Sequence, residues 1–167
     1  MLLLLALPAG SLPAPAAEGS SEYRIKAAYL YNFIAFTEWP QPRPGTLTLC
    51  IYGTDPYGTE LDRYQGKTLG RQTLAILRTQ SVRDLEDCQA VFISRSVIGN
   101  LPRVFDHLAG RAVLTVADAP GAMNQGVMLN MLREQDKIVF EANLGAARAA
   151  QLQLSSKLLR LSTQVLR

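Results

Sequence analysis

The sequence contains few of the residues that most enzyme and metal sites require. Its 167 residues include one histidine, two cysteines and one tryptophan. One histidine and two cysteines do not complete the ligand set of a common zinc site. His107 is the only imidazole, and no Gly-x-Ser-x-Gly motif accompanies it, which argues against a Ser-His-Asp hydrolase. We therefore predict a non-enzymatic protein with no catalytic residues, no metal site and no bound cofactor.

The glycines do not form a phosphate-binding fingerprint. Residues 53–58 follow a predicted strand, a place at which α/β folds often hold phosphates. This segment lacks both the lysine of a P-loop and the three glycines of a dinucleotide turn, and Pro56 removes a backbone donor. A turn with a helix N-cap at Asp55 is the simpler interpretation.

A strong charge of one sign is also missing. Seventeen Lys and Arg residues are balanced by fourteen Asp and Glu residues, and the formal net charge is +3. The cations are interleaved with the acids and form no basic run, so we predict no nucleic-acid partner. A hydrophobic content of 48% and a charged content of 19% are typical of one globular domain at this length.

The first seventeen residues differ in composition from the rest. An apolar run from Leu2 to Leu7 precedes helix-breaking residues and the small residues around Ala16, which predicts a signal peptide over residues 1–17. The start of this segment lacks Lys and Arg, which would be explained if the signal peptide were clipped at its N-terminus. The alternative interpretation of the segment is a short apolar anchor or tail. No later segment has about 18 continuous apolar residues, so we expect no membrane span after cleavage.

An aromatic segment over residues 22–39 predicts an amphipathic helix that Pro40 ends. Three- and four-residue steps predict its buried face. The residues at these steps are Ile25, Ala28, Tyr29, Asn32, Phe33 and Phe36. Arg24, Lys26 and Thr37 fall elsewhere on the helix.

The rest of the sequence alternates strand and helix patterns. Strands are predicted over residues 47–52, 74–78, 90–94 and 112–117, with a hairpin of 127–132 and 138–144 that ends the sheet. Helices are predicted over residues 56–64, 100–108, 146–151 and 155–166, the last with Leu158, Leu161 and Val165 turned inward. This order predicts a single-domain α/β fold over residues 22–166, with a mixed central β-sheet flanked by α-helices.

Five blocks of the sequence resemble the YfiR/HmsC-like family of small periplasmic regulators. They are the aromatic helix, Leu49-Cys-Ile-Tyr-Gly, Asp55-Pro-Tyr-Gly, Phe140-Glu-Ala-Asn-Leu and Ser155-Ser-Lys-Leu-Leu-Arg-Leu. The resemblance covers residues 22–166. It implies a periplasmic homodimer that binds the extracytoplasmic sensor domain of an inner-membrane diguanylate cyclase and represses it, which lowers cyclic di-GMP and biofilm formation.

The two cysteines, Cys50 in a predicted strand and Cys88 before another, agree with export. An even pair in an exported protein can form one disulfide, and two free buried thiols are the alternative. The resemblance implies that these two residues are bridged. Some family members carry a second cysteine pair that this sequence lacks, so we expect no redox behaviour tied to that pair.

Glu141 lies among apolar residues in the last predicted strand, on one face with Val139 and Asn143. A buried carboxylate is stable only when it is paired, so a salt bridge to Arg148 or Lys157, or exposure on an edge strand, is one interpretation. The other is contact with a partner protein, which the resemblance favours. We then expect Leu129 and Ala147, on the neighbouring strand and the following helix, to take part in partner binding.

A second function class is compatible with the same sequence. A periplasmic small-molecule-binding module that acts on a membrane kinase or transporter would also be exported and would also lack catalytic residues. Tyr31 and Trp39 lie off or beyond the predicted apolar face of the first helix, so we regard them as possible contact residues.

Overall fold

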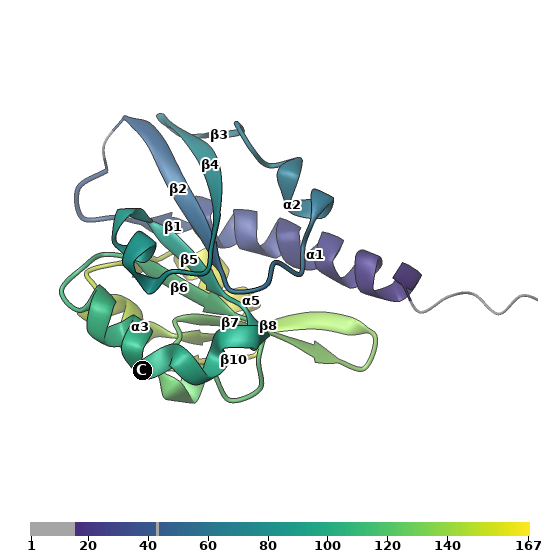
Figure 1. Ribbon diagram of the computed structural model, residues 1–167. Helices are drawn as coiled ribbons and strands as arrows, with labels where there is room; N and C mark the ends of the chain where they lie inside the picture. Colours follow the sequence, from purple (N-terminus) through teal and green to yellow (C-terminus); the bar gives the residue numbers. More distant parts are fainter. Residues whose placement is uncertain (1–15, 43) are drawn as a thin grey trace, which may run out of the picture.

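A computed structural model describes residues 16–42 and 44–167 as an α/β domain (Figure 1). Residues 1–15 of the predicted signal peptide lie outside the described part. The main sheet has eight strands in the order β10-β8-β7-β6-β5-β2-β4-β3, and β1 and β9 form a separate two-stranded sheet. Helices flank the main sheet, so the predicted single-domain α/β fold is confirmed.

The elements have the following bounds. The strands are β1 (Thr37–Glu38), β2 (Gly45–Tyr52), β3 (Thr68–Leu69), β4 (Gln72–Thr79), β5 (Ala90–Ile93), β6 (Leu114–Ala117), β7 (Leu129–Glu134), β8 (Lys137–Asn143), β9 (Gln153–Leu154) and β10 (Gln164–Leu166). The helices are α1 (Ala16–Ala35), α2 (Thr59–Asp62), α3 (Leu101–Leu108), α4 (Leu144–Ala149) and α5 (Ser156–Leu161).

Five strands of the main sheet run parallel, in the spatial order β4-β2-β5-β6-β7. From β2 the chain passes to β4, which lies on one side of β2, and then returns to β5, which lies on the other side of β2. The strand order therefore reverses between β2 and β5, which makes this a topological switch point of the sheet. β8 is antiparallel to β7, as predicted for a hairpin.

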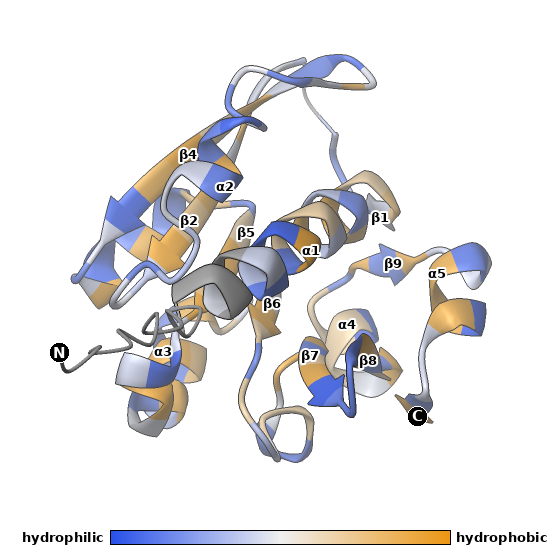
Figure 2. Ribbon diagram, turned by 90° about the vertical axis from the view of Figure 1, so that its right-hand side faces the viewer, coloured by the Kyte–Doolittle hydropathy of each residue, from blue (hydrophilic) through white to orange (hydrophobic). Residues whose placement is uncertain are grey.

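Helices cover both faces of this sheet. α1, purple in Figure 1, packs on one face against Leu49, Phe92, Val116 and Phe140, whereas α3 packs on the other face against residues such as Val91. Figure 2 shows apolar residues concentrated on the central strands beside α1. β5 is buried along its whole length, as expected for a central parallel strand.

The buried face of α1 differs from the predicted one. Its fully buried residues include Lys26, Ala27, Leu30, Phe33 and Ile34, which are offset by about one position from the predicted set. Ile25 is 46% exposed and Asn32 is exposed, so these two assignments were wrong. The physical reason is that Ala27, Leu30, Phe33 and Ile34 form a second apolar stripe at helical spacing, and Lys26 beside it is buried because it pairs with Asp118.

The end of α1 also differs from the prediction. The helix stops at Ala35 because Thr37, which is buried, begins a strand that pairs with β9. The Thr37 hydroxyl donates a 2.6 Å hydrogen bond to the Phe33 carbonyl, which satisfies one of the last helical acceptors. Proline at position 40 therefore follows a strand and not a helix.

The C-terminal segment corrects two further predictions. The helix expected over residues 155–166 is only α5, and the chain then forms β10, which pairs parallel with β8 through Gln164 opposite Glu141. The hairpin therefore does not end the sheet. Leu158 is buried as predicted, but Leu161, the last residue of α5, is 67% exposed, so this assignment was wrong.

The disulfide between Cys50 and Cys88 is present, with 5.9 Å between the two Cα atoms. It links β2 to the residue that precedes β5 by two positions, so it joins the two strands of the switch point. Among residues 16–42 and 44–167, no helix combines the length and the hydropathy that a bilayer span requires.

Candidate functional site at the carboxyl edge of the sheet

The carboxyl ends of β2, β5 and β6 meet at one edge of the sheet, where open α/β folds commonly place their functional residues. Asp118 follows β6 directly, and Arg95 begins the turn of 3-10 helix after β5. α1 crosses this edge with its N-terminal half. These elements bring Tyr23, Lys26, Arg95 and Asp118 together, and we call these four residues the Asp118 cluster.

The Asp118 carboxylate is the centre of this cluster. It is 1% exposed, and one of its oxygens accepts hydrogen bonds from the Lys26 ammonium at 2.7 Å and the Tyr23 hydroxyl at 2.9 Å. Arg95 donates its Nε–H to the Asp118 carbonyl at 2.9 Å and lies 3.3 Å from the second carboxylate oxygen. Burial of an ion pair is expensive unless such additional hydrogen bonds compensate it. Here three donors compensate one buried carboxylate.

A second carboxylate extends the cluster toward the β7–β8 hairpin. Glu22 forms a close ion pair with Lys26, one helical turn away on α1. Arg133 of β7 approaches the same carboxylate at 3.4 Å. The first turns of α1 are therefore attached by charge both to the edge of the sheet and to the hairpin.

Two tyrosines complete the α1 side of the edge. The rings of Tyr23 and Tyr57 meet edge to face with centroids 5.3 Å apart, and Tyr57 packs similarly on Phe92. Burial, and then the neighbouring Asp118 carboxylate, raise the pKa of both phenols well above the ordinary tyrosine value. Both hydroxyls therefore stay protonated at physiological pH, and Tyr23 remains a donor to Asp118.

Two asparagines of the β7–β8 hairpin bind the segment that follows Asp118 from the opposite face of the sheet, and Glu141 accepts a hydrogen bond from one of them. Asn130 accepts from the Ala119 N–H at 3.2 Å and donates to the Ala119 carbonyl at 3.0 Å. It also donates to Glu141 at 3.1 Å. Asn143 donates to the Met123 carbonyl and accepts from the first turn of α4. We call Asn130, Glu141 and Asn143 the loop-anchor residues.

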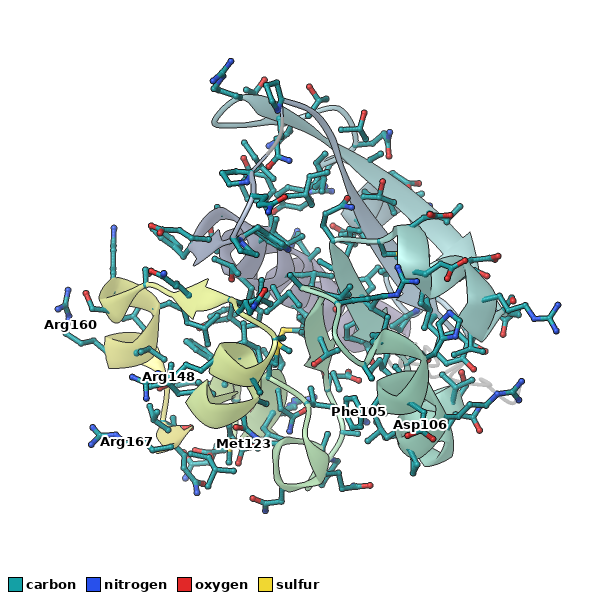
Figure 3. The ribbon with its side chains drawn as sticks, turned by 90° about the vertical axis from the view of Figure 1, so that its left-hand side faces the viewer. Phe105, Asp106, Met123, Arg148, Arg160 and Arg167 are labelled. Carbon is teal, nitrogen blue, oxygen red and sulfur yellow. A yellow bond between two sulfur atoms is a disulfide. The ribbon has the colours of Figure 1, made fainter. Side chains whose placement is uncertain are left out.

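The loop-anchor residues hold residues 119–126 against the β7–β8 hairpin. In the view of Figure 3, Met123 of this loop lies between Phe105 of α3 and Arg148 of α4. Asp118 and Ala119 are consecutive, and they are bound from opposite faces of the sheet. Hydrogen bonds through Asn130 and this one step of backbone therefore connect Glu141 to Asp118 and α1.

The residues predicted for partner binding have different environments. Glu141 is partly exposed; the ion pairs of the described residues do not include it, and its carboxylate accepts from Asn130 instead of Arg148 or Lys157. Leu129 and Ala147 are fully buried in the core on the α1 side. A partner could touch these two side chains only after a change in the conformation of the domain.

Lys26, Asp118 and Asn130 were not singled out from the sequence. A signal existed for Asp118, because an acidic residue directly after a buried parallel strand falls at the carboxyl edge. No signal in the sequence indicated that Lys26 is buried, because a lysine in an amphipathic helix is ordinarily exposed. Its partner lies 92 positions away in the chain.

The buried ion pair is poorly placed for chemistry on a substrate. Lys26 is 0% and Asp118 1% exposed, so no substrate reaches either group while α1 is in place. Within the described ranges, no group of three or more His, Cys, Asp or Glu residues is placed to hold a metal. His107 lies at the end of α3, 3.9 Å from Glu86.

A family model described as YfiR/HmsC-like matches residues 23–163. This chain belongs to the YfiR/HmsC-like family. The match confirms the resemblance seen in the sequence and includes every residue of the Asp118 cluster and every loop-anchor residue. The family is one of regulators, and the disulfide fits an oxidising compartment.

Two solved structures share the fold. The ABC domain from Streptococcus pneumonia, solved in complex with L-Trp, has 10% identity and a TM-score of 0.59 over 84% of this chain. A conserved domain protein from Vibrio cholerae O1 biovar eltor str. N16961 has 7% identity and a TM-score of 0.52 over 86% of this chain. This chain covers 60% of each of those chains. At such identities the likeness concerns the fold alone.

Proposed function

We propose that this protein is a periplasmic, non-enzymatic repressor of an inner-membrane diguanylate cyclase. It binds the extracytoplasmic domain of that enzyme and thereby lowers cyclic di-GMP and biofilm formation. The observation that carries this proposal is the YfiR/HmsC-like match over residues 23–163. The disulfide between Cys50 and Cys88 supports a place outside the cytoplasm, which an N-terminal signal peptide would provide. The active form in this proposal is a homodimer.

The surface around Glu141 is the proposed contact with the cyclase. Glu141 is the partly exposed end of the hydrogen-bonded chain that runs through Asn130 to Ala119. Leu129 and Ala147 then contribute as buried supports of the strand and helix on either side of it. A partner that binds one arrangement of this loop better than another changes the populations of the two arrangements.

A pull-down experiment tests this proposal. The mature protein is immobilised on a resin and incubated with detergent-solubilised membranes that contain the cyclase. Wild-type protein should retain the cyclase, whereas E141K should retain at most about a tenth, since reversing one interfacial charge commonly costs more than 1.4 kcal/mol of binding free energy. The matched control is E134K, which reverses an exposed charge on the same hairpin that makes no ion pair among the described residues.

The two variants must also be compared in stability. If E141K and E134K unfold at the same urea concentration and only E141K loses the cyclase, Glu141 acts in partner binding. If E141K loses stability in proportion to its loss of binding, the residue acts through the loop it anchors. Failure of wild-type protein to retain the cyclase contradicts the proposed function itself.

A further inference from the structure

A pocket of about 430 Å³ lies at the edge of the sheet opposite to the Asp118 cluster. Its walls come from the end of α1, from β1, from the first residues of β2 and from the β3–β4 hairpin. The volume lies within the range of small-molecule sites. None of the residues discussed for the cyclase interface lines this pocket.

The inner wall of the pocket is apolar. Ile34 and Leu47 belong to the main hydrophobic core and are 1% and 2% exposed, and the half-buried Leu69 closes the side formed by β3. A ligand with an apolar or aromatic body would therefore be in contact with side chains that are already held rigidly by the core. Such preorganised apolar walls are typical of binding pockets.

Trp39, the only tryptophan in the sequence, forms another wall. Its ring is half-buried, and its indole N–H is buried with no hydrogen-bond partner among the described residues. A buried donor without an acceptor is uncommon and calls for an explanation. The position of this ring is therefore not fixed by a hydrogen bond of its indole N–H to any described residue.

Glu38 supplies the charge of the pocket. It is exposed, it is the only ionisable side chain among the described residues that line the pocket, and it takes part in none of their ion pairs. A carboxylate beside an aromatic ring favours a cation, because the carboxylate attracts the charge and the ring face adds a cation–π contact. The pocket therefore combines an apolar floor with one carboxylate at its rim.

We propose that this pocket binds a small organic amine with an apolar or aromatic body. The amine pairs with Glu38, and the body packs on Trp39 and on the core side chains of the inner wall. This site does not depend on the proposed repression of a cyclase, because its occupancy is measured on the isolated protein. It does share a helix with the Asp118 cluster, since Ile34 and Ala35 line the pocket and Lys26 lies two turns earlier on α1.

Trp39 supplies the readout, because it is the only tryptophan in the sequence and it lines this pocket. It also lines a neighbouring pocket that includes Arg148, and a variant at Ala35, which lines only the first pocket, distinguishes the two. The mature protein is titrated with 2-phenylethylamine up to about 10 mM, well above the Kd of a weak millimolar site. We expect a saturable change in the emission of Trp39. 2-Phenylethanol, which lacks the positive charge, should bind about 10-fold more weakly, and 3-phenylpropanoate should show no saturable change.

Matched variants assign the signal to the pocket. A35F places a ring in the pocket from the last residue of α1 and should abolish the saturable change. A149F makes the same substitution at the last residue of α4, which is also exposed and lines a different pocket, and it should bind like wild type. E38Q should weaken binding of 2-phenylethylamine about 5- to 10-fold and leave binding of 2-phenylethanol unchanged.

Circular dichroism and thermal unfolding of each variant confirm that it is folded before binding is compared. The proposal is overturned if 2-phenylethylamine produces no saturable change in wild type. It is also overturned if 3-phenylpropanoate binds as well as the amine, or if A35F and A149F bind alike. None of these outcomes bears on capture of the cyclase by the immobilised protein, so the two proposals succeed or fail separately.

Discussion

Lys26 is the residue on which the attachment of α1 most depends. Its ammonium is fully buried against Asp118, so its removal takes away the only buried cation beside this carboxylate and leaves it with Tyr23 and the largely exposed Arg95. We expect K26M to lower the free energy of unfolding by about 3–5 kcal/mol. K137M removes an exposed lysine from β8 and should change it by less than about 0.5 kcal/mol. Urea unfolding of the two variants checks this, and equal stabilities would contradict the role of Lys26.

The two tyrosines of the same edge predict a dependence on alkaline pH. Their pKa values are raised in the folded protein, so the folded state keeps the phenolic protons more tightly than the unfolded chain. Stability from this source is complete below about pH 10, the unfolded value, and is lost as the pH rises beyond it. Between pH 8 and pH 11, the urea midpoint of unfolding should fall less in the Y23F/Y57F double variant than in wild type. An identical fall in both proteins would contradict the assignment.

Tyr57 alone allows a test of a different kind. Its hydroxyl is buried without a hydrogen-bond partner among the described residues. Such a group destabilises the folded state by about 1–3 kcal/mol relative to a partnered one. Y57F should therefore be as stable as wild type or more stable at pH 7 in urea unfolding. A clear loss of stability would show that the hydroxyl has a partner after all.

At the scale of the elements, the loop of residues 119–126 depends on two asparagines and Glu141. Asn143 bonds the Met123 carbonyl and caps α4, so N143A should cost about 1–2 kcal/mol and speed amide hydrogen exchange in the loop and in the first turn of α4. N124A, in an exposed asparagine of the same loop, is the matched control. Similar exchange in both variants would mean that Asn143 does not hold the loop.

The elements that sequence patterns predicted well are those whose residues carry their own signal. The buried runs of β5 and β6 and the hairpin of β7 and β8 were located within a few residues. The face of α1 was not, because this segment contains two overlapping apolar stripes, and the one that is buried lies beside Lys26, whose partner Asp118 is 92 positions away. β10 was missed because Leu158 and Val165 have helical spacing, although residues 164–166 extend to pair with β8. Long-range pairing of this kind leaves no local pattern.

At the scale of the whole molecule, the disulfide holds the switch point of the sheet together. Cys50 and Cys88 are 38 positions apart, and closing a loop of this size stabilises the folded state by about 4 kcal/mol in the chain-entropy model. We expect the C50A/C88A double variant to unfold at a lower temperature, with a loss of about 2–5 kcal/mol. Thermal unfolding in oxidising buffer checks this. An unchanged midpoint would mean that the bridge is dispensable for the fold.

The candidate site could be located in part from the sequence, because the Phe140-Glu-Ala-Asn-Leu144 block pointed to Glu141. The hydrogen bonds that the residues of this block form could not be predicted from the sequence. Glu141 and Asn143 are loop-anchor residues, and their partners, Asn130 and Met123, come from a strand and a loop that only the fold brings close. The same block therefore has a structural and a proposed regulatory role.

Repression of a diguanylate cyclase is best tested by the cellular concentration of cyclic di-GMP after deletion of the gene. With the cognate cyclase present, deletion should raise cyclic di-GMP, and wild-type protein and E134K should restore the original concentration. E141K should fail to restore it while it accumulates to the same amount as wild type. An unchanged concentration of cyclic di-GMP after deletion would contradict the account.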